Sequence, residues 1–446
     1  MNKISTYIKS FSLGIFILLF GTFSNQLKAQ TSLDKENLSL VTAIQYAVDN
    51  HPLIKEAEDR VSIAKAKTQE QQSSFYPQAN VNLNYNFIGP LPYIQLPIAG
   101  GGKFHLAAHN NYDGGLAVNY LIYDFNRRKE ALKLLQSNQT TASEKINLIR
   151  NQLAFQTADV YYSILYFQKS IDVMNQQIQD LNEHMSVARK LVLTGSATAL
   201  DTLSTNVRVT ALTSQKINLQ SQLEKTCVLL KSLMNYPEGK AYKLTGKFEE
   251  TNYSYTLAYL IQKAYSQREE LTLNKLYTHT ANIQKALIEK INMPILDFHS
   301  NFGVKNGYPD HLKRLRANYV LGLSAEIPVF DGYLRKAKIT TAGLNIQSIQ
   351  DHASVIALNI RTEVEQAMLD YKNKIVQLKS VQEEIVLAEA AIKQAKGLYK
   401  SGSITNTTLL DTETSLAQAR LKYTYQLYLL TLSHYKLMQA TGEKIW

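Results

Sequence analysis

One pattern of apolar residues occurs twice in this chain, and it constrains the fold more than any other feature. Between positions 171 and 192 the apolar residues follow alternating steps of three and four, and the same steps recur 207 residues later (378 − 171 = 207). The members are Ile171, Met174, Ile178, Leu181, Met185, Ala188 and Val192, then Leu378, Val381, Ile385, Ala388, Ile392, Ala395 and Tyr399. This spacing is the seam of a coiled coil, and its repetition indicates an elongated, duplicated helical fold.

The duplication extends beyond the two seams. Asp124 and Asp331 are also 207 residues apart, whereas Pro77 and Pro294 are 217 apart, so the first half has ten extra residues between Pro77 and Asp124. The Gly- and Pro-rich stretch 89–104 lies there and is predicted to be part of a longer loop over 89–113.

Each half is predicted to contain the same elements in the same order. A helix (41–74 or 256–292) precedes two strands, then a helix of about 70 residues and, after a short turn, a returning helix. The long helices are expected over 125–194 and 332–401, and the returning helices over 199–235 and 407–440. At 1.5 Å rise per residue a long helix would reach about 100 Å, which excludes a compact globule.

Four runs of alternating apolar and polar residues predict strands, at 79–87, 116–122, 296–302 and 318–327. In the first run, Asn residues alternate with Ala79, Val81, Leu83, Tyr85 and Phe87. Each run is about as long as a tilted strand that crosses a bilayer. An antiparallel sheet on a soluble core would show the same alternation of apolar and polar residues. The matched lengths of the four runs, and the predicted export signal at residues 1–29, favour strands that cross a membrane.

The beginning of the chain resembles an export signal. Lys3 and Lys9 precede the apolar run 11–20, and a small residue, Ala29, is suited to cleavage, so 1–29 is predicted to be a signal peptide. No later segment is apolar enough to span a bilayer as a helix. The single cysteine, Cys227, excludes an internal disulfide and is too distant to anchor a lipid at the cleavage site. The net charge of +11 comes from scattered residues, and no nucleic-acid motif is present.

Strand number constrains the assembly, because four strands cannot close a barrel that encloses a channel and open edges cannot remain unpaired in lipid. Three chains would supply twelve strands (3 × 4 = 12), an even number within the usual range. Arithmetic alone also permits two or four chains.

Several short motifs together are similar to the TolC-like outer membrane efflux protein family, over nearly all of the predicted mature chain. They are the strand ends 121–124 and 328–332, the turns 193–196 and 402–405, the segments 409–411 and 417–420, and the end 437–442. The resemblance implies an α+β membrane protein whose long antiparallel helical hairpins form a periplasmic α-barrel. Each of three copies would give four strands to a 12-stranded β-barrel in the outer membrane. The expected divisions are the signal peptide (1–29), a first repeat (30–240), a linker (241–255) and a second repeat (256–446).

The resemblance also implies a gate at the helical turns. Asp411 matches the second of two aspartates that ring the constriction in family members, while Thr408 occupies the place of the first. Tyr399 matches a tyrosine that latches the closed state, with Asp201 as its acceptor. Ile404 stands where an arginine would form a second tether. Gly195 and Gly402 mark the turns, where contact with a periplasmic adaptor is expected.

The expected function is passive export of small molecules, such as drugs, toxic compounds or metal ions, through a homotrimer opened by adaptor docking. The partners would be the adaptor (a membrane fusion protein), an inner-membrane pump and outer membrane lipid, with no nucleic acid. Alternatives are a type I protein-secretion conduit and a periplasmic coiled-coil scaffold or adaptor. An enzyme is not expected: no catalytic, cofactor-binding or metal-binding residue is predicted, and the pair His105 and His109 lies in the Gly-rich loop.

Overall fold

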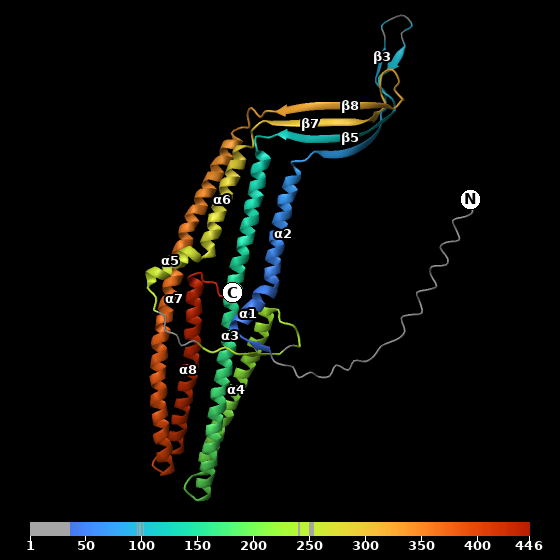
Figure 1. The fold of residues 1–446 in the computed structure, drawn as a ribbon. Helices are drawn as coiled ribbons and strands as arrows, with labels where there is room; N and C mark the ends of the chain where they lie inside the picture. Colours follow the sequence, from blue (N-terminus) through green and yellow to red (C-terminus); the bar gives the residue numbers. More distant parts are fainter. Residues whose placement is uncertain (1–35, 96, 98–99, 101, 240, 249–253) are drawn as a thin grey trace, which may run out of the picture.

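The computed structural model describes residues 36–446, apart from 96, 98–99, 101, 240 and 249–253. The predicted signal peptide lies outside these residues. The described chain is a long rod of helices with a sheet across one end and two helical hairpins at the other (Figure 1).

The two longest helices have equal length. α3 (Arg127–Leu193) and α7 (Leu334–Lys400) each contain 67 residues, which confirms the prediction of helices of about 70 residues. Each turns back into a shorter helix, α4 (Ala199–Met234) after α3 and α8 (Asn406–Ala440) after α7. α3 also packs against α8, so the two hairpins contact each other through a long helix.

Each predicted first helix is two helices in the structure. The first half contains α1 (Leu40–Asn50) and α2 (Pro52–Ser73), separated at His51, whose backbone is extended. Steric contact with the ring of Pro52 disfavours helical geometry at the preceding residue, so the proline explains this break.

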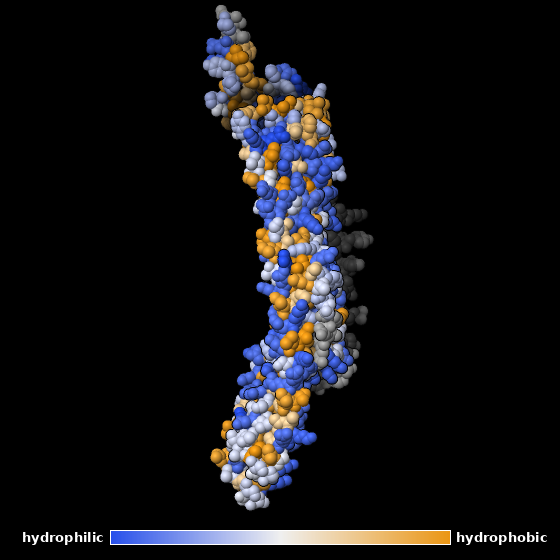
Figure 2. Space-filling view, turned by 90° about the vertical axis from the view of Figure 1, so that its left-hand side faces the viewer, coloured by the Kyte–Doolittle hydropathy of each residue, from blue (hydrophilic) through white to orange (hydrophobic). Residues whose placement is uncertain are grey.

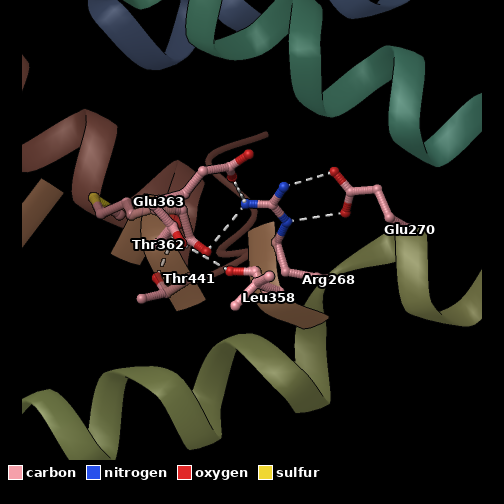
Figure 3. A network of polar contacts seen from close by, with 8 residues as sticks. Arg268, Glu270, Leu358, Thr362, Glu363 and Thr441 are labelled. Carbon is pink, nitrogen blue, oxygen red and sulfur yellow. Dashed lines mark hydrogen bonds and ion pairs between the residues drawn. The ribbon is translucent and has the colours of Figure 1, made fainter. Parts of the chain in front are cut away.

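The second half breaks at Arg268, between α5 (Leu257–Gln267) and α6 (Glu269–Glu289), where no proline is present. The Arg268 guanidinium donates two bonds to the Glu270 carboxylate, at 2.7 and 2.9 Å, and one to Glu363 on α7 at 2.7 Å (Figure 3). It also donates to the carbonyl of Ala440, the last residue of α8. One buried side chain therefore joins this corner to both helices of the second hairpin.

Four strands form one antiparallel sheet in the order β2-β5-β7-β8. They are β2 (Gln78–Phe87), β5 (Asn110–Tyr123), β7 (Ile295–Lys305) and β8 (Arg316–Glu326). All four predicted strands are present, and β5 begins six residues before the predicted run. The outer strands β2 and β8 each have one edge with no partner among the described residues.

The predicted loop of the first half contains a further small hairpin. β3 (Tyr93–Gln95) pairs with β4 (Lys103–His105) and projects beyond the main sheet (Figure 1). The predicted loop between β2 and β5 therefore contains two short strands that its Gly and Pro content did not indicate.

A short parallel pair lies at mid-height of the rod. β1 (Glu36–Leu38) pairs with β6 (Tyr242–Leu244), which falls within the stretch predicted as a linker. The largest hydrophobic cluster lies here, around Tyr161 of α3, whose hydroxyl donates to the Leu38 carbonyl at 2.9 Å. This region attaches the shorter elements to the long helix and leaves the hairpin tips free at the far end.

Candidate gate at the hairpin tips

The long helices α3 and α7 end in the same backbone motif, one at each hairpin tip. Gly195 and Gly402 have φ of +74° and +73°, in the left-handed region that glycine enters without strain. The amide of the next residue bonds back to the helix in each tip, from Ser196 to Leu191 at 2.8 Å and from Ser403 to Leu398 at 2.9 Å. This Schellman pattern ends α3 and α7 and reverses the chain within a few residues.

The predicted constriction residues lie on one exposed face of α8. Thr408 and Asp411 are three residues apart, one helical turn, and both are exposed. The Asp411 Oδ1 atom lies 3.3 Å from a guanidinium nitrogen of Arg208 on α4. The carboxylate therefore has a cationic partner from the other hairpin, which the sequence analysis did not foresee.

The predicted hydrogen bond between Tyr399 and Asp201 is not formed. Tyr399 is buried, and its hydroxyl has no hydrogen-bond partner among the described residues. The Asp201 carboxylate instead accepts from the amide and hydroxyl of Thr198, at 2.8 and 3.0 Å, and caps the start of α4. Burial, and secondly the negative charge of Asp201, raise the pKa of Tyr399.

The Tyr399 ring lies flat against the ring of His184 on α3, with centroids 5.2 Å apart. His184 Nε2 lies 2.7 Å from Asn406 Oδ1, and Nδ1 lies 3.5 Å from a carboxylate oxygen of Glu413. His184, Asn406 and Glu413 are all buried. A polar cluster thus joins the first hairpin to the second immediately behind the exposed face of Asp411.

Ile404 packs in an apolar cluster around Tyr399, with Leu191 of the other hairpin among its neighbours. In place of a polar tether, this position therefore contributes apolar contact.

The residues that sequence reasoning missed are Arg208, His184, Asn406 and Glu413. A signal was present for His184, because the offset of 207 aligns it with the apolar Ala391. A polar side chain in one half, aligned with an apolar residue in the other half, indicates a contact that is not repeated.

Neither a metal site nor a helical membrane anchor is found in the part of the chain that the structure describes. No group of three or more His, Cys, Asp or Glu side chains there is placed to bind a metal ion. None of the described helices combines the length and apolar character needed to cross a bilayer.

The sequence profile of the outer membrane efflux protein family matches residues 43–236 and 260–443, which is most of the chain. The chain belongs to this family. It is a TolC-like outer membrane efflux protein with a large periplasmic portion, and not an enzyme.

Individual relatives are distant. A probable outer membrane lipoprotein of Salmonella typhimurium, SilC, is 20% identical over 392 residues, covering 83% of this chain and 78% of SilC. The solved structure of CusC superposes with a TM-score of 0.75 at 16% identity, covering 94% of this chain and 96% of CusC. The open state of the Neisseria gonorrhoeae channel MtrE gives 0.73 at 14% identity, covering 93% of each chain. At these identities the structures establish the shared fold.

Proposed function

We propose that three copies of this efflux protein assemble into one channel that exports small molecules across the outer membrane. Four strands from each copy would close a 12-stranded barrel, and the helices would form a periplasmic tunnel that narrows at the hairpin tips. The two halves, 30–240 and 256–446, would be structural repeats, which is supported by the separate family matches in each half.

A row of exposed apolar side chains across the sheet supports this proposal most directly. Val81 pairs with Leu116, Leu116 with Phe302, and Phe302 with Tyr319, so one row crosses all four strands. These side chains are 71, 44, 50 and 75% exposed. Residues that face each other across antiparallel strands lie on the same side of a sheet, so this side presents an apolar band to its surroundings. Lipid is the solvent that such a band favours.

Both edges of the sheet support assembly from several copies. One edge of β2 and one edge of β8 have no strand partner among the described residues, and backbone groups at such an edge cannot remain unpaired in hydrocarbon. Pairing the β8 edge of one copy with the β2 edge of the next would satisfy both.

Exposed apolar residues along the helices extend the same argument to the rod. Figure 2, which views the rod from the side of α5 and α7, shows hydrophobic patches among hydrophilic ones along its length. The exposed apolar residues on α4 include Leu200, Leu203, Val207, Ile217 and Val228, and those on α7 include Leu344, Leu358, Leu369, Val376 and Leu387. In a closed ring, α4 of one copy would cover α7 of the next.

The gate of this channel would lie at Asp411 and Thr408, repeated three times around the axis. Three carboxylates in a narrow aperture would attract cations. An adaptor would bind at the tips near Gly195 and Gly402. In the closed channel the Tyr399 hydroxyl would donate to Asp201, because both bonds from Thr198 go to Oδ2 of that carboxylate and Oδ1 can still accept.

Single-channel recording of the purified protein in a planar bilayer tests the proposal. Native mass spectrometry should show a trimer, and the trimer should give discrete openings. Asp411→Ala should enlarge the openings or make them less cation-selective. A protein that stays monomeric in the membrane, or trimers of both forms that never conduct, would contradict it.

A further inference from the structure

His184 is a buried ionisable group that takes no part in the proposed gate. It lies on α3, and its polar contacts are on α8 of the other hairpin. The first is Asn406, at the start of α8, and the second is Glu413, two helical turns further along. The imidazole ring on α3 of the first hairpin therefore contacts two positions on α8 of the second hairpin.

The orientation of Asn406 determines where one proton of His184 lies. Its amide nitrogen donates to the Asp201 carbonyl at 3.1 Å, so its oxygen faces His184 Nε2 at 2.7 Å. An amide oxygen only accepts hydrogen bonds, so Nε2 must donate. A neutral imidazole protonated at Nε2 would present the lone pair of Nδ1 to Glu413.

An ionised Glu413 calls for a cation at Nδ1. Its side chain is only 6% exposed, and neither carboxylate oxygen has a hydrogen-bond partner among the described residues. A buried carboxylate is stable when a charge of opposite sign faces it. The imidazolium form of His184 supplies this charge 3.5 Å away.

The other charged groups around this pair come from three helices. A cavity of about 190 Å³ beside the pair is lined by Asp180 and Glu183 of α3 and by Lys396, Tyr399 and Lys400 of α7. From α4, Asp201 takes part through its carbonyl, because its carboxylate caps the helix. Lys396 is the group here that opposes protonation of His184.

We propose that His184, Asn406 and Glu413 form a proton-dependent clamp between the hairpins, closed while His184 is an imidazolium and released when it loses a proton. This inference rests on the proposed function, because the clamp closes the gate only if the hairpin tips form one. It assigns His184 as a positioning residue for the face of α8 that bears Asp411.

The direction of the pH response follows from the contacts. Burial lowers the pKa of His184, but its interactions with Glu413 and Asn406 outweigh this, and the pKa is raised above 6.5. A group whose folded pKa is raised stabilises the folded contacts at low pH and loses that effect as pH rises through the folded pKa. The clamp should therefore be closed in acid and released in mildly alkaline medium.

The test is the open probability of single channels as a function of pH. In the unmodified channel it should rise by about tenfold between about pH 6 and pH 9, in line with loss of one proton per clamp. Glu413→Gln places a neutral amide beside a neutral His184 and should give a closed channel without pH response. His184→Gln keeps a donor for Asn406 but leaves Glu413 unpaired, and should give an open channel without pH response.

Controls separate a clamp from a general structural role. His352→Gln removes an exposed histidine elsewhere on α7 and should keep the full pH response. In the unmodified channel, hydrogen exchange of amides 406–413 should accelerate with pH by more than the intrinsic chemical rate of exchange. The two clamp variants should not show this extra acceleration. If both clamp variants keep the normal pH profile, or if the unmodified channel shows none, the clamp is refuted. Asp411→Ala, recorded at constant pH, tests the gate itself independently of this outcome.

Discussion

Arg208 on α4 lies 3.3 Å from Asp411 on α8, so the carboxylate expected at the channel constriction is paired with a cation from the same chain. Both side chains are substantially exposed, at 38 and 67%. An ion pair in contact with solvent contributes little to stability, so its main effect is on the charge presented to passing ions.

Removing this cation should make the channel more cation-selective. In Arg208→Gln each Asp411 loses its partner, and we expect the ratio of cation to anion permeability to rise by about two- to threefold. The reversal potential in a salt gradient measures this ratio. Arg208→Lys keeps the charge and should match the unmodified channel. Equal selectivity in all three proteins would show that the pair does not face the permeation path.

Tyr399→Phe tests whether the tyrosine hydroxyl latches the closed channel. Loss of the hydroxyl would remove the latch bond to Asp201, so basal conductance should rise several-fold. In the described conformation the hydroxyl is buried without a partner among the described residues, so stability should not fall. Conductance and thermal unfolding of the trimer check the two parts. Unchanged basal conductance would show that the hydroxyl does not hold the channel closed.

The glycines at the tips should tolerate asparagine better than alanine. Gly195 and Gly402 have positive φ, and an added Cβ would meet no other atom within 4 Å, so the penalty is one of backbone conformation alone. We expect alanine to cost about 1 kcal/mol at either position and asparagine less, since asparagine enters the left-handed region more easily. Chemical unfolding of the four variants measures the differences. Equal stability for alanine and asparagine would exclude strain as the cause.

The corner at Arg268 should be sensitive to acid. Burial raises the pKa of Glu270, but its bonds to Arg268 outweigh this and lower the pKa below 4.5. A lowered folded pKa means that the contribution to stability is complete above about pH 4.5 and is lost as pH falls through the folded pKa. Thermal unfolding between about pH 6 and pH 3 should therefore show a smaller acid loss in Glu270→Gln than in the unmodified protein.

Replacing the arginine tests the same corner at neutral pH. Arg268→Met leaves Glu270 and Glu363 without their cation. It should destabilise the protein by about 1–2 kcal/mol, less than for a fully buried pair, because these carboxylates are 33 and 52% exposed. Exposed Arg60, paired with Glu56 on α2, offers a matched control whose change to Met should have little effect. A similar loss in both variants would contradict the role assigned to the Arg268 network.

Sequence periodicity predicted the long helices and strands because their patterns are local and continuous. The seam residues are spaced as a packed helix requires, and the alternation at 79–87 corresponds to β2. The break before Pro52 could have been anticipated from the proline, whereas the break at Arg268 depends on partners far away in the sequence.

The gate region was less predictable for the same reason. Family resemblance pointed to Asp411 and Tyr399, but the partner of each depends on how the hairpins pack. Arg208 and His184 each contact residues more than 200 positions away, and no local pattern encodes such a contact.

The two free edges of the sheet also have a consequence for biogenesis. The backbone hydrogen bonds of a helix lie within the helix, so the rod of helices in each chain can form before the chain meets another copy. If β2 and β8 pair with neighbouring copies as proposed, strand closure and subunit association become a single event that depends on chain concentration. In that case each chain would carry two strand edges open to incorrect pairing until it meets two further copies, so rapid association would protect it from aggregation.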